Sequence, residues 1–95
     1  MKYRLVIPLA IERDIARLSP NLKGKVRAAL EVIRENPHLG KPLRDELKGH
    51  WSYRVVRYRI VYRIHHHRVE VQVIDMGPRN VIYERVIAAM TKEPR

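Results

Sequence analysis

The stretch SYRVVRYRIVYRIHHHRVEVQVI, residues 52–74, decides the fold of this chain. Apolar and polar residues alternate along it with a period of two, which is typical of β-strands that bury one face. Turns at Val56-Arg57 and at His66-His67 give one consistent set of strand pairings. We therefore predict two successive hairpins that form a small antiparallel sheet.

The first predicted hairpin places Arg54 opposite Arg59, although Val56-Arg57 lacks the Gly, Asn or Asp that two-residue turns prefer. The second hairpin places Ile64 opposite Val69. One face of the sheet then carries the expected core, which consists of Tyr53, Val55, Tyr58, Ile60, Tyr62, Ile64, Val69, Val71 and Val73. The other face is basic at one end and carries Ser52, Arg54, Arg59, Val61, Arg63, Glu70 and Gln72.

The first half of the chain has helical periodicity instead. A short first helix is predicted from an apolar stripe at spacings of four and three, formed by Ile11, Ile15 and Leu18. A second helix is predicted to begin at Ser19-Pro20, since Ser is a favoured N-cap and Pro a favoured first helical residue, and to end at Asn36-Pro37. Its apolar stripe consists of Leu22, Val26, Leu30 and Ile33. Two such helices form a hairpin whose apolar faces need the sheet as a partner.

The remaining segments connect or flank these elements. Residues 2–7 are a β-rich opening, and residues 37–50 form a loop long enough to suggest a role. Residues 75–78 are expected to break the last strand. A terminal helix is predicted over Val81–Met90, with Ile82, Val86 and Met90 along one face, and the tail from Thr91 to Arg95 is expected to fray.

A chain of 95 residues is expected to form one domain, because it does not bury two independent cores. We assign residues 1–95 to a single α+β domain, in which an N-terminal two-helix hairpin packs on a small antiparallel sheet and a short C-terminal helix follows.

The net charge of +10 attracts polyanions. The sequence has no Cys, no secretory leader and no apolar run long enough to span a bilayer, so we expect a cytoplasmic protein without a membrane partner.

Positive charge is concentrated in residues 47–69, which contain no Asp or Glu. Arg54 and Arg59 face each other across the predicted hairpin, where like charges destabilise a sheet unless an anion lies between them. The alternative is that the Arg stems cover apolar sheet while their charged ends stay solvated. In the first case, further residues in this segment that would bind the anion, with RNA as one candidate, are Lys48, Arg57, Arg63 and Arg68.

Arg79 and Tyr83 extend this candidate site. Arg79 follows Gly77-Pro78, where a turn would direct its guanidinium towards Arg54 and Arg59; the alternative is an arginine at a helix start with no special partner. Tyr83 would face the same site from the first helical turn, or would pack in the core. Three guanidinium groups and a phenol around one hollow suit phosphodiester chemistry, because they hold the phosphate and neutralise charge growing on its oxygens. Such a site requires no metal or other cofactor.

Two further features have structural explanations. Residues 65–67 are three histidines, but neighbours on an extended chain point to opposite sides, so we expect a solvated loop rather than a metal site. Trp51 is expected to anchor the junction of loop and strand, with base stacking as the alternative.

A family resemblance lies in two segments, ENPHLGKPLRDELKGHWSYRVVRYRIVYRI (35–64) and VEVQVIDMGPRNVIYERV (69–86). Their most specific parts are LKG before an aromatic residue, the run YRIVYRI, and G-x-R with a Tyr four residues after the Arg. With these parts the chain resembles the RelE/ParE superfamily of toxins from bacterial and archaeal toxin–antitoxin modules. The resemblance implies a two-helix hairpin packed on a small antiparallel sheet.

Resemblance to the RelE branch implies an endoribonuclease that cuts ribosome-bound messenger RNA without metal, by attack of a ribose 2′-oxygen on the adjoining phosphate. Arg59 matches the family Arg that binds the scissile phosphate, and Arg79 matches the Arg that stabilises the transition state. Arg54 stands where a second basic residue is frequent. Tyr83 matches a Tyr placed near the reacting nucleotide.

Two positions depart from the RelE pattern: Ser52 replaces a basic residue implicated in catalysis, and Pro78 replaces a frequent His or Lys. No obvious general base remains. The resemblance therefore leaves open the ParE branch, whose members inhibit DNA gyrase without nuclease activity, and a basic binding domain without toxicity is a third alternative. Either toxin branch implies a cognate antitoxin as protein partner.

Overall fold

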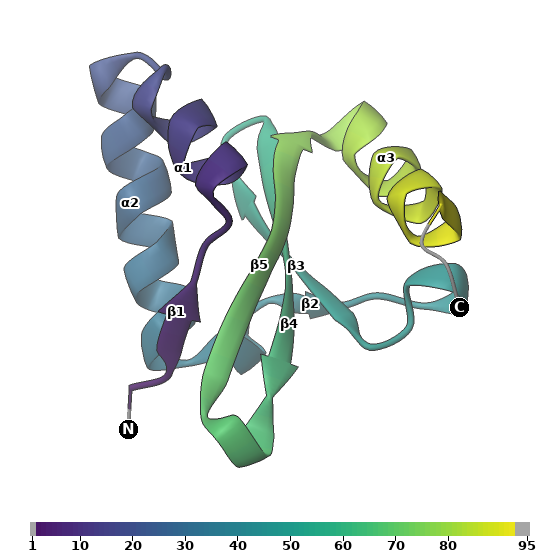
Figure 1. The fold of residues 1–95 in the computed structure, drawn as a ribbon. Coiled ribbons are helices and arrows are strands. Elements are labelled where there is room, and N and C mark those ends of the chain that lie inside the picture. The colour runs from purple at the N-terminus through teal and green to yellow at the C-terminus, as the bar shows by residue number, and fades with distance from the viewer. Residues whose placement is uncertain (1, 93–95) are drawn as a thin grey trace.

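The computed structural model describes residues 2–92, which form three α-helices and a five-stranded sheet (Figure 1). The elements follow one another as β1 (Arg4–Val6), α1 (Leu9–Ala16), α2 (Pro20–Glu35), β2 (Lys41–Pro42), β3 (His50–Val55), β4 (Tyr58–His65), β5 (Glu70–Pro78) and α3 (Arg79–Lys92). None of the helices in this part of the chain is long and apolar enough to cross a membrane.

The sheet is mixed, with the strand order β1-β5-β4-β3-β2. The α+β class is confirmed, but the prediction of a wholly antiparallel sheet is wrong, because β1 pairs in parallel with β5. The N-terminal helical hairpin is matched only in part: α1 has 8 residues against 16 in α2, and β1 precedes both.

Local sequence signals set the bounds of α2. The Ser19 hydroxyl accepts a hydrogen bond from the Leu22 amide at 3.4 Å, and Pro20 is the first helical residue, as predicted. The helix ends at Glu35, immediately before Asn36-Pro37. Its buried residues are Val26, Ala29, Leu30 and Ile33.

Helices cover both faces of the sheet. Figure 1 shows α1 and α2 on one side and α3 on the other. The main core lies under α1 and α2 and includes Ile15, Ile33, Ile60, Tyr62, Val71 and Val73. A smaller core lies under α3 and consists of Leu47, Val61, Ile82 and Val86. Three of the seven residues on the face predicted to be polar are therefore buried, namely Ser52, Val61 and Glu70, and α3 covers Val61.

The first hairpin has the predicted register, with Arg54 opposite Arg59 and Tyr53 opposite Ile60. Val56 takes a φ of 57°, a left-handed conformation that is unfavourable for a β-branched residue. The pattern of buried side chains therefore overrides the poor turn sequence, because a slip of one residue would turn the whole strand over.

The predicted register of the second hairpin is wrong by two residues. Ile64 lies opposite Val71 rather than Val69, because residues 66–68 form a 3-10 turn and Val69 takes a left-handed φ of 48°. Next to the turn, this even shift keeps the paired side chains on their predicted faces, so the core pattern did not reveal it. A bulge between Val61 and Tyr62 then changes the register again, and Ile60 lies opposite Met76. Val69 lies in the turn rather than in the core.

The strand β5 continues through residues 75–78, so the predicted break there is wrong. Gly77 and Pro78 are tolerated because β1 pairs only with residues 70–72, which leaves this end of β5 with one neighbouring strand. The chain then enters α3 at Arg79, two residues earlier than predicted. The helix ends at Lys92, so Thr91 and Lys92 are helical rather than frayed, and the rest of the predicted tail lies outside the described residues.

The loop after α2 is fastened to the sheet by one buried side chain. Tyr62 donates a hydrogen bond from its hydroxyl to the carbonyl oxygen of Pro37 at 2.6 Å. Burial raises the pKa of Tyr62 to about 12. A Cβ at Gly40 would lie 2.1 Å from the same hydroxyl, so only glycine allows this close approach.

Candidate active site

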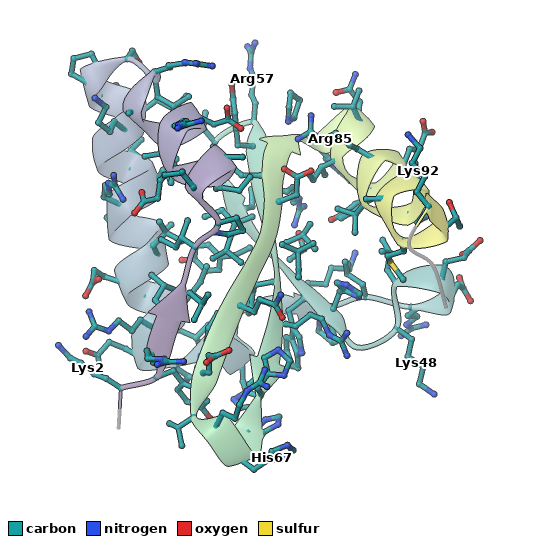
Figure 2. All side chains as sticks on the ribbon, in the orientation of Figure 1. Lys2, Lys48, Arg57, His67, Arg85 and Lys92 are labelled. Atoms are coloured by element: carbon teal, nitrogen blue, oxygen red, sulfur yellow. The ribbon has the colours of Figure 1, made fainter. Side chains whose placement is uncertain are left out.

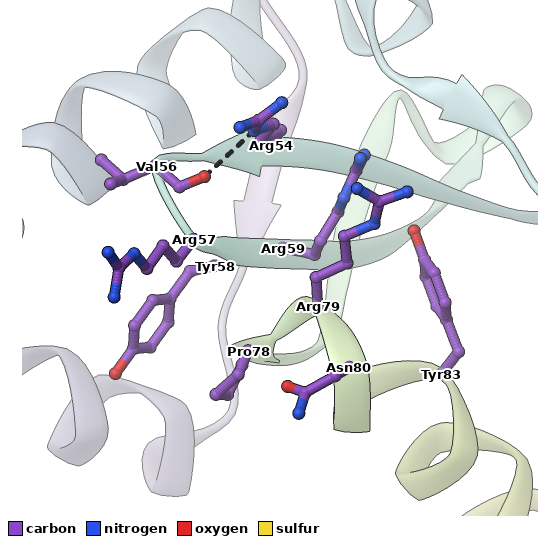
Figure 3. A pocket seen from close by; sticks show the side chains of 9 residues that line it. All are labelled: Arg54, Val56, Arg57, Tyr58, Arg59, Pro78, Arg79, Asn80 and Tyr83. Atoms are coloured by element: carbon purple, nitrogen blue, oxygen red, sulfur yellow. Dashed lines mark hydrogen bonds between the residues drawn. The ribbon is translucent and has the colours of Figure 1, made fainter.

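A hollow of about 640 Å³ opens between the β3–β4 turn and the start of α3 (Figure 3). Its lining residues are Arg54, Val56, Arg57, Tyr58, Arg59, Pro78, Arg79, Asn80 and Tyr83. All four residues predicted to be catalytic therefore line one hollow. Four arginines and no carboxylate are present among these lining residues, which makes the hollow suited to an anion.

Strand pairing brings the arginines together. Arg54 and Arg59 lie opposite each other on β3 and β4, and Gly77 of β5 lies opposite Arg59 on its other side. Since β5 runs directly into α3, Arg79 follows two residues after that glycine. The Arg79 amide donates to the Arg57 carbonyl oxygen at 3.2 Å, which ties the start of α3 to the hairpin.

Arg59 has an unused hydrogen-bond donor in this hollow. Its Nε is buried and has no protein partner within residues 2–92, although buried donors are nearly always paired. Figure 3 shows the Arg59 and Arg79 side chains projecting to the same side as the Tyr83 hydroxyl. Neither arginine forms an ion pair with a carboxylate of the described chain. Their charges are therefore available to a ligand.

Arg54 is held differently. Its Nε donates to the carbonyl oxygen of Val56 at 3.0 Å, so its guanidinium folds back over the hairpin turn (Figure 3). The terminal nitrogens of Arg54 form no ion pair with a carboxylate in residues 2–92. Because Arg54 lines the hollow, its charge is also available to an anion there.

Tyr83 is oriented by Ser52. The Tyr83 hydroxyl donates to the Ser52 hydroxyl oxygen at 3.0 Å, and Ser52 is only 1% exposed. The Tyr83 ring also packs beside the smaller core under α3. Both sequence interpretations of Tyr83 therefore apply, since one ring borders the hollow and contacts the core.

Of the predicted RNA-binding residues, only Arg57 lines the hollow. Lys48 lies in the loop before β3, far from Arg57 in Figure 2. Arg63 lies opposite His50 at the other end of the β3–β4 pair. Arg68 lies in the β4–β5 turn and forms an ion pair with Glu70 at 3.4 Å.

The three consecutive histidines diverge. His65 Nε2 lies 2.9 Å from the Gln72 side-chain oxygen, whereas His66 Nε2 lies 3.2 Å from His38 Nε2. His67 is exposed at the tip of the turn (Figure 2). Trp51 is partly buried against the main core and contacts the His38 ring edge-on, as expected for an anchor of this junction.

His50 is the one histidine buried on the α3 side of the sheet, but it does not line the hollow. Its Nδ1 lies 3.3 Å from the Leu47 carbonyl oxygen. Burial lowers the pKa of His50 below its ordinary value of 6.5, and the positive charge of Arg63 lowers it further. A neutral His50 therefore helps to hold the loop against β3.

Besides the smaller core, one arginine holds α3 in position. Arg85 contacts Asp75 at 2.8 Å and donates to the Met76 carbonyl oxygen at 2.8 Å, which joins the helix to β5. A Cβ at Gly77 would lie 2.4 Å from the Arg85 guanidinium, so glycine makes room for it. Because α3 carries Arg79 and Tyr83, this contact also positions the site.

Two features of the site were missed by the sequence interpretation. Asn80 lines the hollow, and its place beside Arg79 on the first helical turn was the available signal. Ser52 was noted only as a departure from a pattern, and its bond to Tyr83 joins positions 31 residues apart. No local pattern in the sequence reveals such a contact.

The chain matches known proteins over most of its length. The family described as "ParE toxin of type II toxin-antitoxin system, parDE" matches residues 7–83. Toxin RelE of Mycobacterium tuberculosis is 41% identical over 85 residues, covering 85% of this chain and 86% of that protein. Toxin RelG of the same organism is 34% identical over 87 residues, covering 90% of this chain and 100% of that protein.

Solved structures show the same similarity. The toxin–antitoxin complex RelBE2 of M. tuberculosis contains a chain with a TM-score of 0.73 and 30% identity, covering 83% of this chain and 93% of that one. A mutant of E. coli toxin RelE in the free state has a TM-score of 0.73 at 22% identity, with 97% of both chains covered, and shares the fold. This chain thus belongs to the ParE toxin family of type II toxin–antitoxin systems, and within it to the RelE-like toxins.

Proposed function

We propose that this toxin is a metal-independent, ribosome-dependent endoribonuclease that cuts messenger RNA and so inhibits translation. The observation that carries this proposal is the hollow in which Arg54, Arg59, Arg79 and Tyr83 come together without a carboxylate. The unpartnered Nε of Arg59 supports it further, because a phosphate oxygen is a suitable acceptor.

In the proposed reaction, a ribose 2′-oxygen attacks the adjoining phosphorus. A new bond from this oxygen to phosphorus forms while the bond from phosphorus to the 5′-oxygen breaks, leaving a 2′,3′-cyclic phosphate and a 5′-hydroxyl. Negative charge grows on the non-bridging oxygens, where Arg59 and Arg79 stabilise it. Guanidinium groups suit this role because they stay charged and offer several donors in one plane.

Tyr83 positions the attacking group in this scheme. Since its hydroxyl hydrogen points to Ser52, its oxygen is free to accept a hydrogen bond from the 2′-hydroxyl. The residues around the hollow include no histidine or carboxylate, so the 2′-proton passes to water and the leaving 5′-oxygen takes a proton from water. This arrangement predicts a slower chemical step than a site with a dedicated base.

A cognate antitoxin is the proposed protein partner. Solved relatives of this fold include the RelBE2 complex of M. tuberculosis and the E. coli RelBE complex. The net charge of +10 favours an antitoxin whose acidic segment covers the basic hollow.

Gyrase inhibition is the second candidate function. Two observations favour it: the chain matches the ParE toxin family, and the residues lining the hollow include no general base. It is a binding function, so the four site residues would contact a protein instead of a phosphodiester.

Primer extension on translated messages tests the choice. We expect new cleavage within codons, and a loss of about 100-fold or more in Arg59→Ala and in Arg79→Ala, the range found when one charge-stabilising donor is removed. Arg13→Ala on the exposed surface of α1 is the matched control and should cleave like the parent. Circular dichroism confirms that each variant is folded, and Arg59→Gln serves if the alanine variant is not.

Two results would contradict the proposed ribonuclease site. Intact messages together with inhibited supercoiling by gyrase would favour the second candidate. Cleavage that persists in both arginine variants would show that another part of the molecule carries the reaction.

A further inference from the structure

A second hollow adjoins the first and shares a wall with it. It measures about 600 Å³ and lies between the loop after β2 and α3. Its lining residues are Lys41, Pro42, Leu43, Arg44, Asp45, Leu47 and Tyr83. Tyr83 lines both hollows, so the two hollows adjoin at this residue.

The second hollow combines positive charge with an apolar surface. Lys41 and Arg44 are exposed, and neither forms an ion pair with a carboxylate anywhere in residues 2–92. Pro42, Leu43 and Leu47 supply the apolar part of the lining. A nucleotide presents the matching pair of surfaces, an anionic phosphate and a flat, largely apolar base.

One acidic residue orients such a ligand. Asp45 lines the same hollow and takes a φ of 56°, a left-handed conformation that non-glycine residues rarely adopt. It begins the 3-10 turn Asp45–Leu47, in which the Leu47 amide donates to the Arg44 carbonyl oxygen at 3.0 Å. A carboxylate repels a phosphate, so Lys41 and Arg44 are the lining residues that attract this group.

We infer that the second hollow is a subsite for the nucleotide next to the one held in the first hollow, with single-stranded RNA as its ligand. Lys41 and Arg44 bind the phosphate, and the apolar surface around Leu43 packs against the base. This inference rests on the proposed function, because it extends the path of the RNA strand past Tyr83. The shared lining residue Tyr83 is the observation that places the two hollows next to each other.

Binding of short RNA analogues tests the subsite directly. We would measure, by fluorescence anisotropy, the affinity of the full chain for 2′-O-methyl RNA of two and of four nucleotides, which contains no 2′-hydroxyl to attack. The longer analogue should bind about tenfold more tightly at about 50 mM salt, and each added phosphate contact should steepen the salt dependence by about 0.7. The double variant Lys41→Ala/Arg44→Ala should lose this gain but bind the dinucleotide as the parent does.

The control is a second double variant that has the same net charge as Lys41→Ala/Arg44→Ala. Arg13→Ala/Lys25→Ala removes two exposed cations from α1 and α2 and should retain the full gain with length. Three results overturn the subsite: no gain on lengthening in the parent, an equal loss in the control, or a full gain in Lys41→Ala/Arg44→Ala. Any of these results would mean that the second hollow does not bind RNA and would favour a protein partner there.

The cleavage assay separates this failure from failure of the proposed function. Cleaved messages without a length-dependent gain in affinity would overturn the second subsite alone. Messages that stay intact would overturn the nuclease, even where the tetranucleotide fills both hollows.

Discussion

Ser52 is a small residue that fixes the orientation of the Tyr83 side chain. It lies on β3 two residues before Arg54, is almost fully buried, and accepts the hydroxyl hydrogen of Tyr83. Where the resemblance leads us to expect a basic residue, this chain therefore has a hydrogen-bond acceptor. The substitution removes a titratable group and fixes the orientation of a phenol instead.

Removing the Ser52 hydroxyl should weaken the reaction without abolishing it. We expect Ser52→Ala to lower kcat by about 2- to 10-fold, the value of one neutral hydrogen bond, while KM changes little. Tyr83→Phe should have at least the same effect, and Ser52→Thr should restore most of the rate because it keeps the hydroxyl. Single-turnover cleavage measures these rates, and an unchanged rate in Ser52→Ala would show that Tyr83 needs no positioning.

Tyr62 affects stability rather than chemistry. Its hydroxyl is the partner of the buried Pro37 carbonyl, so Tyr62→Phe leaves that oxygen unpaired. We expect the free energy of unfolding to fall by about 1–3 kcal/mol, measured by urea denaturation. Cleavage per folded molecule should stay the same, and a loss of activity at full stability would contradict a purely structural role.

At the level of elements, α3 carries part of the site and is attached to the sheet through a small contact area. Arg79 and Tyr83 both lie on this helix, which rests on the small core around Val61 and is joined to β5 through Arg85. The hairpin β3–β4 carries Arg54 and Arg59. The site therefore exists only while the helix stays docked on the sheet.

Loosening α3 should reduce activity more than stability. We expect Arg85→Ala to cost about 0.5–1.5 kcal/mol of unfolding free energy, because the contact is half exposed. Cleavage should fall about tenfold, since Arg79 and Tyr83 lose their fixed geometry. Hydrogen exchange should accelerate in α3 and stay unchanged in β4.

Arg27→Ala is the matched control for that variant. It removes an ion pair of 2.9 Å with Glu12 that joins α1 to α2, far from the site. Its activity should equal that of the parent. If both variants lose activity equally, the effect is one of general destabilisation and not of helix docking.

For the molecule as a whole, charge is distributed unevenly. Carboxylates pair with arginines away from the hollow, as Glu70 does with Arg4 at 2.6 Å and Asp75 with Arg85. The arginines of the hollow have no such partners in the part of the chain described here. The excess positive charge is therefore available where a polyanion would bind.

The stability of the whole domain should depend on pH through His50. Because the folded state lowers the pKa of His50, the unfolded chain binds its proton first as the pH falls. This contribution to stability is complete above the ordinary value of 6.5 and is lost as the pH falls below it towards the folded pKa. Urea denaturation from about pH 7.5 to about pH 5 should show this decline, and His50→Gln should flatten it.

A second decline in the free energy of unfolding should occur at lower pH because of Glu70, so the effects of His50 and Glu70 can be told apart. The hydrogen bond from Arg4 lowers the pKa of Glu70, so its stabilising effect is present above 4.5 and is lost as the pH falls through the folded pKa. A parent that shows no change between neutral pH and 5, or a His50→Gln variant that declines as the parent does, would contradict the role of His50.

The sequence alone determined the features that depend on neighbouring residues or on side-chain period. The cap at Ser19, the end of α2 before Asn36, and the pairing of Arg54 with Arg59 all followed from such signals. The first register was predictable because a slip by one residue would bury the arginines and expose the core. These constraints also placed Arg59 and Arg54 on the face that α3 approaches.

Only the tertiary structure decided the rest. Next to its turn, the second hairpin differs from the predicted register by two residues, which leaves both faces unchanged there, so the turn geometry at residues 66–69 fixed it. The bulge between Val61 and Tyr62 had no signal in the alternating pattern either. The parallel pairing of β1 with β5, the bond from Tyr83 to Ser52, and the absence of Lys48 and Arg63 from the hollow depend on contacts between distant segments. The alternation of apolar and polar residues shows which face of a strand or helix is buried. Contacts between distant segments depend instead on where the chain turns and on which helix covers the sheet.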